Sequence, residues 1–140
     1  MAIKKLNPYL NFPGTAEKAI KLYETALGAK TEGLQRFGDV PGMEIAAEDK
    51  GRVMHAALTI GGGVIMISDT MPGHPFTPGN NTHIALDFDD PADETRKFEA
   101  LTAGGKVTMP LNDTFWGARF GMLVDAVGVQ WMFNYTKPKA

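Results

Sequence analysis

Hydrophobic and polar residues follow two different periods along this chain, and the changes of period mark the expected elements. Residues 6–12 alternate as a short strand does, and Pro13-Gly14 ends that strand. Apolar residues then recur at helical spacing over 16–27, which predicts an amphipathic helix. Thr15 is its expected N-cap and Gly28 its left-handed C-cap. The chain therefore opens with a strand and a helix.

Strand patterns follow this helix at 31–37, 53–60 and 64–68. The polar stretch 38–51 between the first two predicts a long loop, and Gly61-Gly62-Gly63 predicts a hairpin between the last two. Residues 72–79 are the richest in proline and glycine, so we interpret them as a linker.

The second half begins with the alternating stretch 81–90, in which His83 shares a strand face with Ala85 and Asp87. Asp90-Pro91 predicts the start of a helix, which Gly104-Gly105 ends. Further strands are expected at 106–111, 118–124 and 129–135, with a turn at Asn112-Asp113.

Each half therefore has the same order of elements: a strand, a helix and about three more strands. The interval from Pro8 to Thr15 equals that from His83 to Asp90, and Gly62 to Met66 equals Gly128 to Met132. We predict an α+β fold in which two βαβββ modules form a curved, mainly antiparallel sheet around a cleft, with the helices outside. The modules, 1–71 and 80–140, would form one domain spanning residues 1–140, joined by the linker 72–79.

Composition narrows the class of protein. The chain has 140 residues, a net charge of -2 and no basic run, which argues against a nucleic-acid partner. It has no apolar segment of transmembrane length, so we expect no membrane association and a cytoplasmic location. The absence of cysteine excludes disulfides, thiolate catalysis and cysteine-type zinc sites.

Several short motifs, in this order and spacing, resemble the vicinal oxygen chelate superfamily, which includes glyoxalase I, bleomycin-resistance proteins and extradiol dioxygenases. The closest resemblance is to its PhnB-like branch, and it extends over nearly the whole chain. The motifs are Pro8-Tyr9-Leu10-Asn11-Phe12, Lys21-Leu22-Tyr23-Glu24 with Leu27-Gly28, Ser68-Asp69 with Pro72-Gly73, and Phe115-Trp116-Gly117-Ala118-Arg119-Phe120-Gly121 followed by Asp125, Gly128 and Trp131.

The resemblance implies four metal-ligand positions, which fall at Pro8, Met66, His83 and Met132. Proline offers no donor atom, and a thioether suits Cu(I) rather than Ni, Zn, Mn or Fe(II). A single imidazole does not complete a catalytic metal site, which normally has three protein ligands. We therefore expect no metal at these positions and no other cofactor. His55, His74, Glu44 and Asp69 show no ligand spacing that would replace the lost site.

The sequence instead predicts an apolar pocket for a small organic ligand. The candidate binding residues are His83, Asp87, Met66, Ser68, Met132, Phe115, Trp116 and Arg119. His83 would anchor the ligand, and Asp87 would hold the charge or tautomer of its imidazole. Phe115 and Trp116 would form a lid, a dimer contact or a plug over the cavity. Arg119 would either meet an anionic ligand or pair with a nearby aspartate, Asp113 or Asp125.

The same strand alternation assigns side chains to the two faces of each sheet. Expected to face the cleft are Leu10, Phe12, Met66, Ser68, His83, Ala85, Asp87, Gln130, Met132 and Asn134; expected to face the helices are Tyr9, Trp131 and Phe133.

Two functional hypotheses follow from the resemblance. The first is a metal-free protein that sequesters or carries a small organic molecule. The second is a metal-dependent enzyme of the glyoxalase or dioxygenase type that uses His83 in a non-standard ligand set. Members of the superfamily usually pair, so a homodimer is expected in either case. A methyltransferase has no support, because Gly61-Gly62-Gly63 joins two expected strands and does not open a helix.

Overall fold

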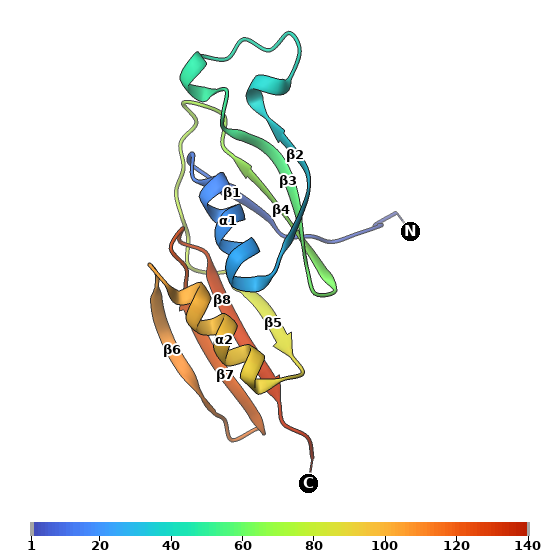
Figure 1. Ribbon diagram of the computed structural model, residues 1–140, viewed down its shortest axis with the longest axis vertical. Coiled ribbons are helices and arrows are strands. Elements are labelled where there is room, and N and C mark those ends of the chain that lie inside the picture. The colour runs from blue at the N-terminus through green and yellow to red at the C-terminus, as the bar shows by residue number, and fades with distance from the viewer. Residues whose placement is uncertain (1, 140) are drawn as a thin grey trace. The chain divides into compact units, whose positions relative to one another are not determined.

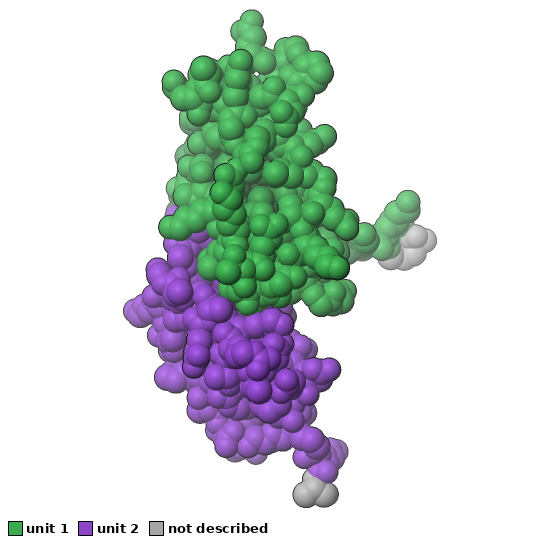
Figure 2. Space-filling view, in the orientation of Figure 1, with its two compact units in different colours: residues 1–77 green, residues 78–140 purple. Residues whose placement is uncertain are grey.

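A computed structural model describes residues 2–139 and shows an α+β protein built from two similar βαβββ modules (Figure 1). The chain divides into two compact units, residues 1–77 and residues 78–140, which Figure 2 colours separately. The boundary lies within the predicted linker. The prediction of an α+β fold with two βαβββ modules is confirmed.

Unit 1 contains a four-stranded mixed sheet and one helix. Its elements are β1 (Tyr9–Phe12), α1 (Ala16–Leu27), β2 (Lys30–Arg36), β3 (Val53–Ile60) and β4 (Gly63–Asp69). The strand order is β1-β4-β3-β2, in which β1 runs parallel to β4 and the other neighbours are antiparallel. The predicted long loop contains two short 3-10 turns, at Phe37–Asp39 and Ala47–Asp49.

Unit 2 repeats this arrangement. Its elements are β5 (Ile84–Phe88), α2 (Pro91–Thr102), β6 (Lys106–Asp113), β7 (Ala118–Val124) and β8 (Gln130–Thr136). The strand order is β5-β8-β7-β6, with β5 parallel to β8. Strand β6 is an edge strand and carries Pro110, which edge positions tolerate because proline donates no ladder hydrogen bond.

The core of unit 1 lies between α1 and one face of its sheet. The helix buries Ala16, Ala19, Ile20 and Tyr23 at helical spacing. The sheet contributes apolar side chains from its two central strands, Ala56, Leu58, Ile65 and Ile67, all of them buried. Gly28 ends the helix with φ 70°, so the predicted C-cap is confirmed.

The N-terminus of α1 is capped from a distant strand. Thr15 occupies the N-cap position, but its side chain makes no capping hydrogen bond. Asp69, at the end of β4, accepts hydrogen bonds from the backbone N–H groups of Gly14 and Ala16, both at 2.9 Å. Its other oxygen accepts from Val53 N at 2.9 Å, so this buried carboxylate joins α1, β3 and β4.

The core of unit 2 is aromatic where α2 packs on its sheet. Phe133 stacks on Phe88 with ring centroids 5.2 Å apart and meets Phe98 edge-to-face at 5.1 Å. Trp131 is fully buried and donates from Nε1 to Asp125 at 2.8 Å. At the start of α2, Asp90 accepts from Ala92 N at 3.0 Å, as its predicted role at the helix start requires.

Several predicted boundaries differ from the structure. Strand β1 begins at Tyr9 and not at residue 6, and β8 runs one residue later than the predicted 129–135. The turn expected at Asn112-Asp113 is wrong: both residues lie in β6, and the β6–β7 turn falls at 114–117. The pairing of β6 with β7 is irregular on either side of Met109, and β6 then continues through Asn112 and Asp113, which pair with β7.

Candidate functional site

Each sheet has one face covered by its helix and one that the helix does not cover, which we call its open face. The open face of unit 2 contains two rows of cross-strand neighbours. The first row is Ala85, Met132, Met122 and Met109, and the second is Asp87, Asn134, Phe120 and Asn112. Neighbours in such rows lie close enough to touch. Three methionine side chains therefore lie next to one another on the adjacent strands β6, β7 and β8.

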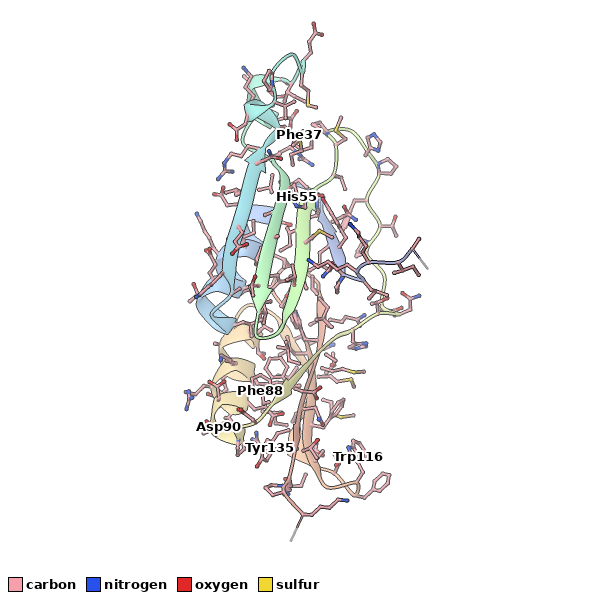
Figure 3. The ribbon with its side chains drawn as sticks, turned by 90° about the vertical axis from the view of Figure 1, so that its right-hand side faces the viewer. Phe37, His55, Phe88, Asp90, Trp116 and Tyr135 are labelled. Carbon is pink, nitrogen blue, oxygen red and sulfur yellow. The ribbon has the colours of Figure 1, made fainter. Side chains whose placement is uncertain are left out.

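An aromatic cluster lies at the end of this face. Trp116, in the β6–β7 turn, approaches Phe120 with ring centroids 6.1 Å apart, and Phe115 meets Trp116 edge-to-face at 5.0 Å. Figure 3 shows Trp116 on the opposite side of the sheet from Phe88 and Tyr135. Phe115 is 97% exposed and Trp116 57% exposed. Two large aromatic rings at the surface form an apolar patch that is available for contact.

His83 lies immediately before β5 and is half-buried. Among residues 2–139 its imidazole has no hydrogen-bond partner. Asp87, the predicted partner on the same face, accepts instead from Asn134 Nδ2 at 3.1 Å. The carboxylate is thus held across the sheet by its register neighbour.

The open face of unit 1 is more polar. Its first row is Tyr9, Met66, Ala57 and Glu32; the second row contains Asn11 and Ser68 on β1 and β4, and His55 with Gln35 on β3 and β2. Tyr9 Oη lies 3.2 Å from His55 Nδ1, and Ser68 Oγ donates to Asn11 Oδ1 at 3.4 Å.

The predicted orientation of β1 is wrong. Tyr9 was expected to face the helix, but it pairs with Met66 on the open face and is 43% exposed. Phe12, expected in the cleft, is 2% exposed and lies with Leu10 on the same side as Ile67, the helix side. In unit 2 the predicted alternation is confirmed, because Trp131 and Phe133 are fully buried.

The cause is one extra residue between β1 and α1. Tyr9 and Ala85 occupy equivalent positions, since each pairs with the methionine of its row. Six positions separate Tyr9 from the N-cap Thr15, and five separate Ala85 from the N-cap Asp90. Gly14 takes up the extra residue at φ 115°, which glycine adopts without strain.

This shift also moves the first family ligand position within unit 1. Counting from the methionine rows, the residue equivalent to His83 is Asn7, not Pro8. By strand alternation Asn7 shares the open face with Tyr9, and its side chain donates to Val64 O at 3.0 Å. The Asn7 amide nitrogen is thus engaged by a backbone carbonyl, and unit 1 has a neutral amide where unit 2 has the imidazole of His83.

Arg119 does not lie on the open face. It shares the helix side of β7 with Gly121 and Leu123, and Nη1 lies 3.0 Å from Glu94 Oε1 on α2. The predicted pairing with Asp113 or Asp125 is therefore wrong, since Glu94 is the partner.

Glu94 is fully buried, and its second oxygen, Oε2, has no partner among the described residues. Burial raises the pKa of this carboxyl above its ordinary value of 4.5, and the Arg119 guanidinium opposes the rise. Arg119 thus stabilises the packing of α2 on the sheet.

The predicted site residues fall into three groups. His83, Asp87 and Met132 share the open face of unit 2 with the Phe115–Trp116 cluster; Met66 and Ser68 lie on the open face of unit 1; Arg119 lies beneath α2. No three histidine, aspartate or glutamate side chains converge as a metal site within residues 2–139.

Three polar residues of unit 1 were not predicted as a site: Tyr9, Asn11 and His55. From the sequence, His55 was considered only as a replacement metal ligand, for which its spacing gave no support. The available signal was the alternation in β3, which separates His55 and Ala57 from the buried Ala56 and Leu58. Only the true register of β1 brings Tyr9 onto the same face.

This fold and these motifs define a member of the glyoxalase/bleomycin resistance protein/dioxygenase superfamily, and the model of that family matches residues 5–133. The chain belongs to that superfamily and to its PhnB-like branch. It is 40% identical to protein PA1353 from Pseudomonas aeruginosa, whose crystal structure it matches with a TM-score of 0.87 over 97% of this chain and 100% of that one. It is 34% identical over 144 residues to Protein YjdN of Escherichia coli strain K12, covering 94% of this chain and 95% of that protein.

A PhnB protein from Bacillus cereus is 26% identical, with a TM-score of 0.79 over 95% of this chain and 100% of that one. It is described as a putative 3-demethylubiquinone-9 3-methyltransferase. In the present chain, Gly61 and Gly62 form the turn between β3 and β4, with Gly61 at φ 54°, so the glycine triplet does not open a helix.

Neither α1 nor α2 has the length and apolarity that crossing a bilayer requires.

Proposed function

We propose that this chain is a cytoplasmic, metal-free protein of the glyoxalase/bleomycin-resistance type that sequesters or carries a small organic molecule. One observation carries the proposal: the open face of unit 2 presents Met109, Met122 and Met132 side by side, bordered by exposed aromatic rings. Methionine side chains adapt their shape to an apolar partner, and aromatic rings supply large contact areas. His83 and Asp87 add polar groups that would orient a ligand.

The donor atoms at the family's metal positions support the absence of a metal. Met66 and Met132 offer thioether sulfur, which binds soft ions and fits Ni, Zn, Mn and Fe(II) poorly. Next to Met132 in its row are Ala85 and Met122, which supply no oxygen or nitrogen ligand from their side chains. These residues do not fit a hard divalent ion.

The alternative function is a metal-dependent enzyme that uses His83. The observation in its favour is the half-buried imidazole, which no side chain or backbone group of residues 2–139 engages in a hydrogen bond. Metal analysis of the purified chain separates the two. Stoichiometric Ni, Zn, Mn or Fe that is lost in His83→Ala would favour the enzyme, whereas substoichiometric metal that is unchanged in this variant supports the binding protein.

The two tryptophans provide a direct binding assay. Trp116 is exposed and approaches Phe120 on the open face of unit 2, whereas Trp131 is fully buried on the helix side. A metabolite that raises the melting temperature in a thermal-shift screen should also change the fluorescence of Trp116. In Trp116→Phe only the buried indole remains, so the ligand should still stabilise the protein while most of the fluorescence change is lost. A full fluorescence change in Trp116→Phe would place the ligand away from this face.

The anchoring role of His83 is tested with a matched histidine variant. His83→Ala should weaken binding of such a metabolite about tenfold, the effect of one lost hydrogen bond in a desolvated site. His74→Ala removes an exposed histidine from unit 1 and should leave the affinity unchanged. Equal affinities for the two variants would remove His83 from the site.

Two copies of the chain are also proposed to pair in solution, as members of the superfamily usually do. Sedimentation equilibrium should return twice the mass of one chain, and a single-chain mass at high concentration would refute the pairing.

A further inference from the structure

The oxidisable sulfur atoms of this chain all belong to methionine. The sequence contains eight methionines and no cysteine. Three of the methionines, Met109, Met122 and Met132, are cross-strand neighbours on the open face of unit 2, and we refer to them as the methionine row. Met109 is 37% exposed and the other two are half-buried, so all three are in contact with solvent.

Met122, in the centre of the row, has apolar neighbours on every side. Across the sheet it lies between Met109 and Met132. Along β7 its neighbours on the same face are Phe120 and Val124, two residues away in each direction. None of these four side chains has a hydrogen-bond donor. The centre of this face therefore has no side chain that would bond an added oxygen atom.

The amide donors closest to the row are already engaged. Asn134 Nδ2 donates to Asp87 Oδ1 at 3.1 Å, and Gln130 Nε2 donates to the backbone oxygen of Thr82 at 2.9 Å. An oxygen atom on the Met122 sulfur would consequently take its hydrogen bonds from water. An apolar ligand that covers the face removes this water.

Hydrogen peroxide adds such an oxygen atom to a thioether. The peroxide O–O bond breaks, a sulfur–oxygen bond forms, and the sulfur gives up two electrons. The second peroxide oxygen leaves with both protons as water, so the peroxide is the species reduced. The product, methionine sulfoxide, is polar, and reductases convert it back to methionine. A sulfoxide oxygen covered by a ligand without a donor weakens binding, because a desolvated acceptor is left unsatisfied.

We propose that the methionine row is an oxidation site, and that its conversion to sulfoxide by a peroxide releases an apolar ligand from unit 2. Met122 is the residue whose oxidation weakens binding most. The inference rests on the proposed small-molecule-binding function and adds redox control of the same site. Met66 in unit 1 provides a contrast, because its open-face neighbours Tyr9 and Ser68 carry hydroxyl groups.

The test uses Nile red, a neutral dye that becomes fluorescent in apolar surroundings, and the full chain before and after treatment with hydrogen peroxide. Peptide mass spectrometry identifies the methionines that carry the added oxygen. Nile red should bind the native chain. Once the methionine row is oxidised, it should bind at least tenfold more weakly, as expected for one unsatisfied polar group.

Two leucine variants locate the sensitive sulfur atoms. The triple variant Met109→Leu/Met122→Leu/Met132→Leu keeps an apolar surface without sulfur, so it should bind Nile red as the native chain does and remain insensitive to peroxide. The double variant Met43→Leu/Met71→Leu is the matched control, because it removes two exposed thioethers of unit 1. It should lose binding on oxidation to the same extent as the native chain.

A glutamine variant imitates the oxidised side chain without any oxidant. Met122→Gln introduces a polar group of similar length and should weaken Nile red binding about tenfold, whereas Met66→Gln should leave it unchanged. Unchanged melting temperatures show that both variants are folded. Native affinity in Met122→Gln overturns the proposal, as does a triple leucine variant that loses binding on oxidation as far as the native chain.

The remaining outcomes separate this inference from the proposed function. A native chain that does not bind Nile red refutes the apolar site of unit 2 and this inference with it. Binding that persists after all three methionines of the row are oxidised refutes the inference alone. Row methionines that stay reduced while Met43 and Met71 are oxidised also refute it.

Discussion

Replacing Asp69 with asparagine should destabilise unit 1 strongly, although the two side chains have nearly the same shape. Asp69 is 4% exposed and accepts three backbone hydrogen bonds, two on Oδ1 from Gly14 and Ala16 and one on Oδ2 from Val53. Asparagine can keep the first two on its amide oxygen. Its NH₂ group then faces the N–H of Val53, and two donors meet in a buried site.

The expected cost follows from these three bonds. One buried N–H left without an acceptor costs about 2 kcal/mol, and the change of two charge-assisted bonds to neutral ones adds about 1 kcal/mol. Asp69→Asn should therefore lose about 3 kcal/mol, a large part of the roughly 5–15 kcal/mol that stabilises a typical domain. Asp69→Ala leaves all three N–H groups without an acceptor and should lose more.

The assay is urea unfolding followed by far-ultraviolet circular dichroism, together with amide hydrogen exchange at Ala16 and Val53. Both tryptophans belong to unit 2, so tryptophan fluorescence alone would not report on this change. Asp113→Asn provides the matched control, because Asp113 is exposed and pairs with Lys137 at the surface. A loss in Asp69→Asn no larger than in Asp113→Asn, with native exchange rates at Val53, would refute the proposed role of the carboxylate.

Three further predictions concern stability. Because burial raises the pKa of Glu94, the folded state holds a proton there more tightly than the unfolded state. This group's contribution to the free energy of unfolding is complete below the ordinary pKa of 4.5 and is lost as the pH rises through the raised pKa of the folded state. Glu94→Gln should flatten this decline when urea unfolding is measured across pH. A pH profile of stability that is the same in the native chain and in Glu94→Gln would contradict the prediction. Gly105→Ala would place a methyl group against the backbone oxygen of Val124 and should cost about 3 kcal/mol by calorimetry, whereas Gly28→Ala, at φ 70° with open space around it, should cost only about 1 kcal/mol. Equal losses of stability in the two alanine variants would contradict this prediction, because the backbone at Val124 would then have moved away from the new methyl group at little cost.

The repeated fold was predictable because its signals are local. Alternation located β3 and β7 at their observed bounds, and the helical spacing from Ala16 to Leu27 located α1. Gly28 and Asp90 were predicted at helix ends because the cap residues themselves have the required chemistry. Each of these inferences needs no more than a few neighbouring residues.

Contacts between residues that are far apart in the sequence could not be predicted from such local patterns. The acceptor at the N-terminus of α1 is Asp69, which lies 53 positions from Ala16, and no local pattern pairs them. The partner of Arg119 was missed for a related reason: the sequence suggested nearby aspartates, whereas Glu94 approaches from α2. The predicted cleft and the pairing of two chains stay predictions.

The error in β1 had the largest consequence for the candidate site. The spacing from Pro8 to Thr15 matched that from His83 to Asp90, but it concealed the extra residue at Gly14. A shift of one residue in a strand reverses every side chain on it. Tyr9 was consequently assigned to the helix side, and its hydrogen bond with His55 was not foreseen.

With the register corrected, the two units can be compared position by position. Their helix sides are similarly apolar, and both open faces keep a methionine at the same place, Met66 and Met132. The remaining open-face positions differ: Tyr9, Ala57, Asn11, Ser68 and His55 in unit 1 correspond to Ala85, Met122, Asp87, Asn134 and Phe120 in unit 2. Because packing against the helix constrains only the other face, the βαβββ fold does not dictate these residues. Unit 2 therefore offers a ligand apolar area, while unit 1 offers directed hydrogen bonds.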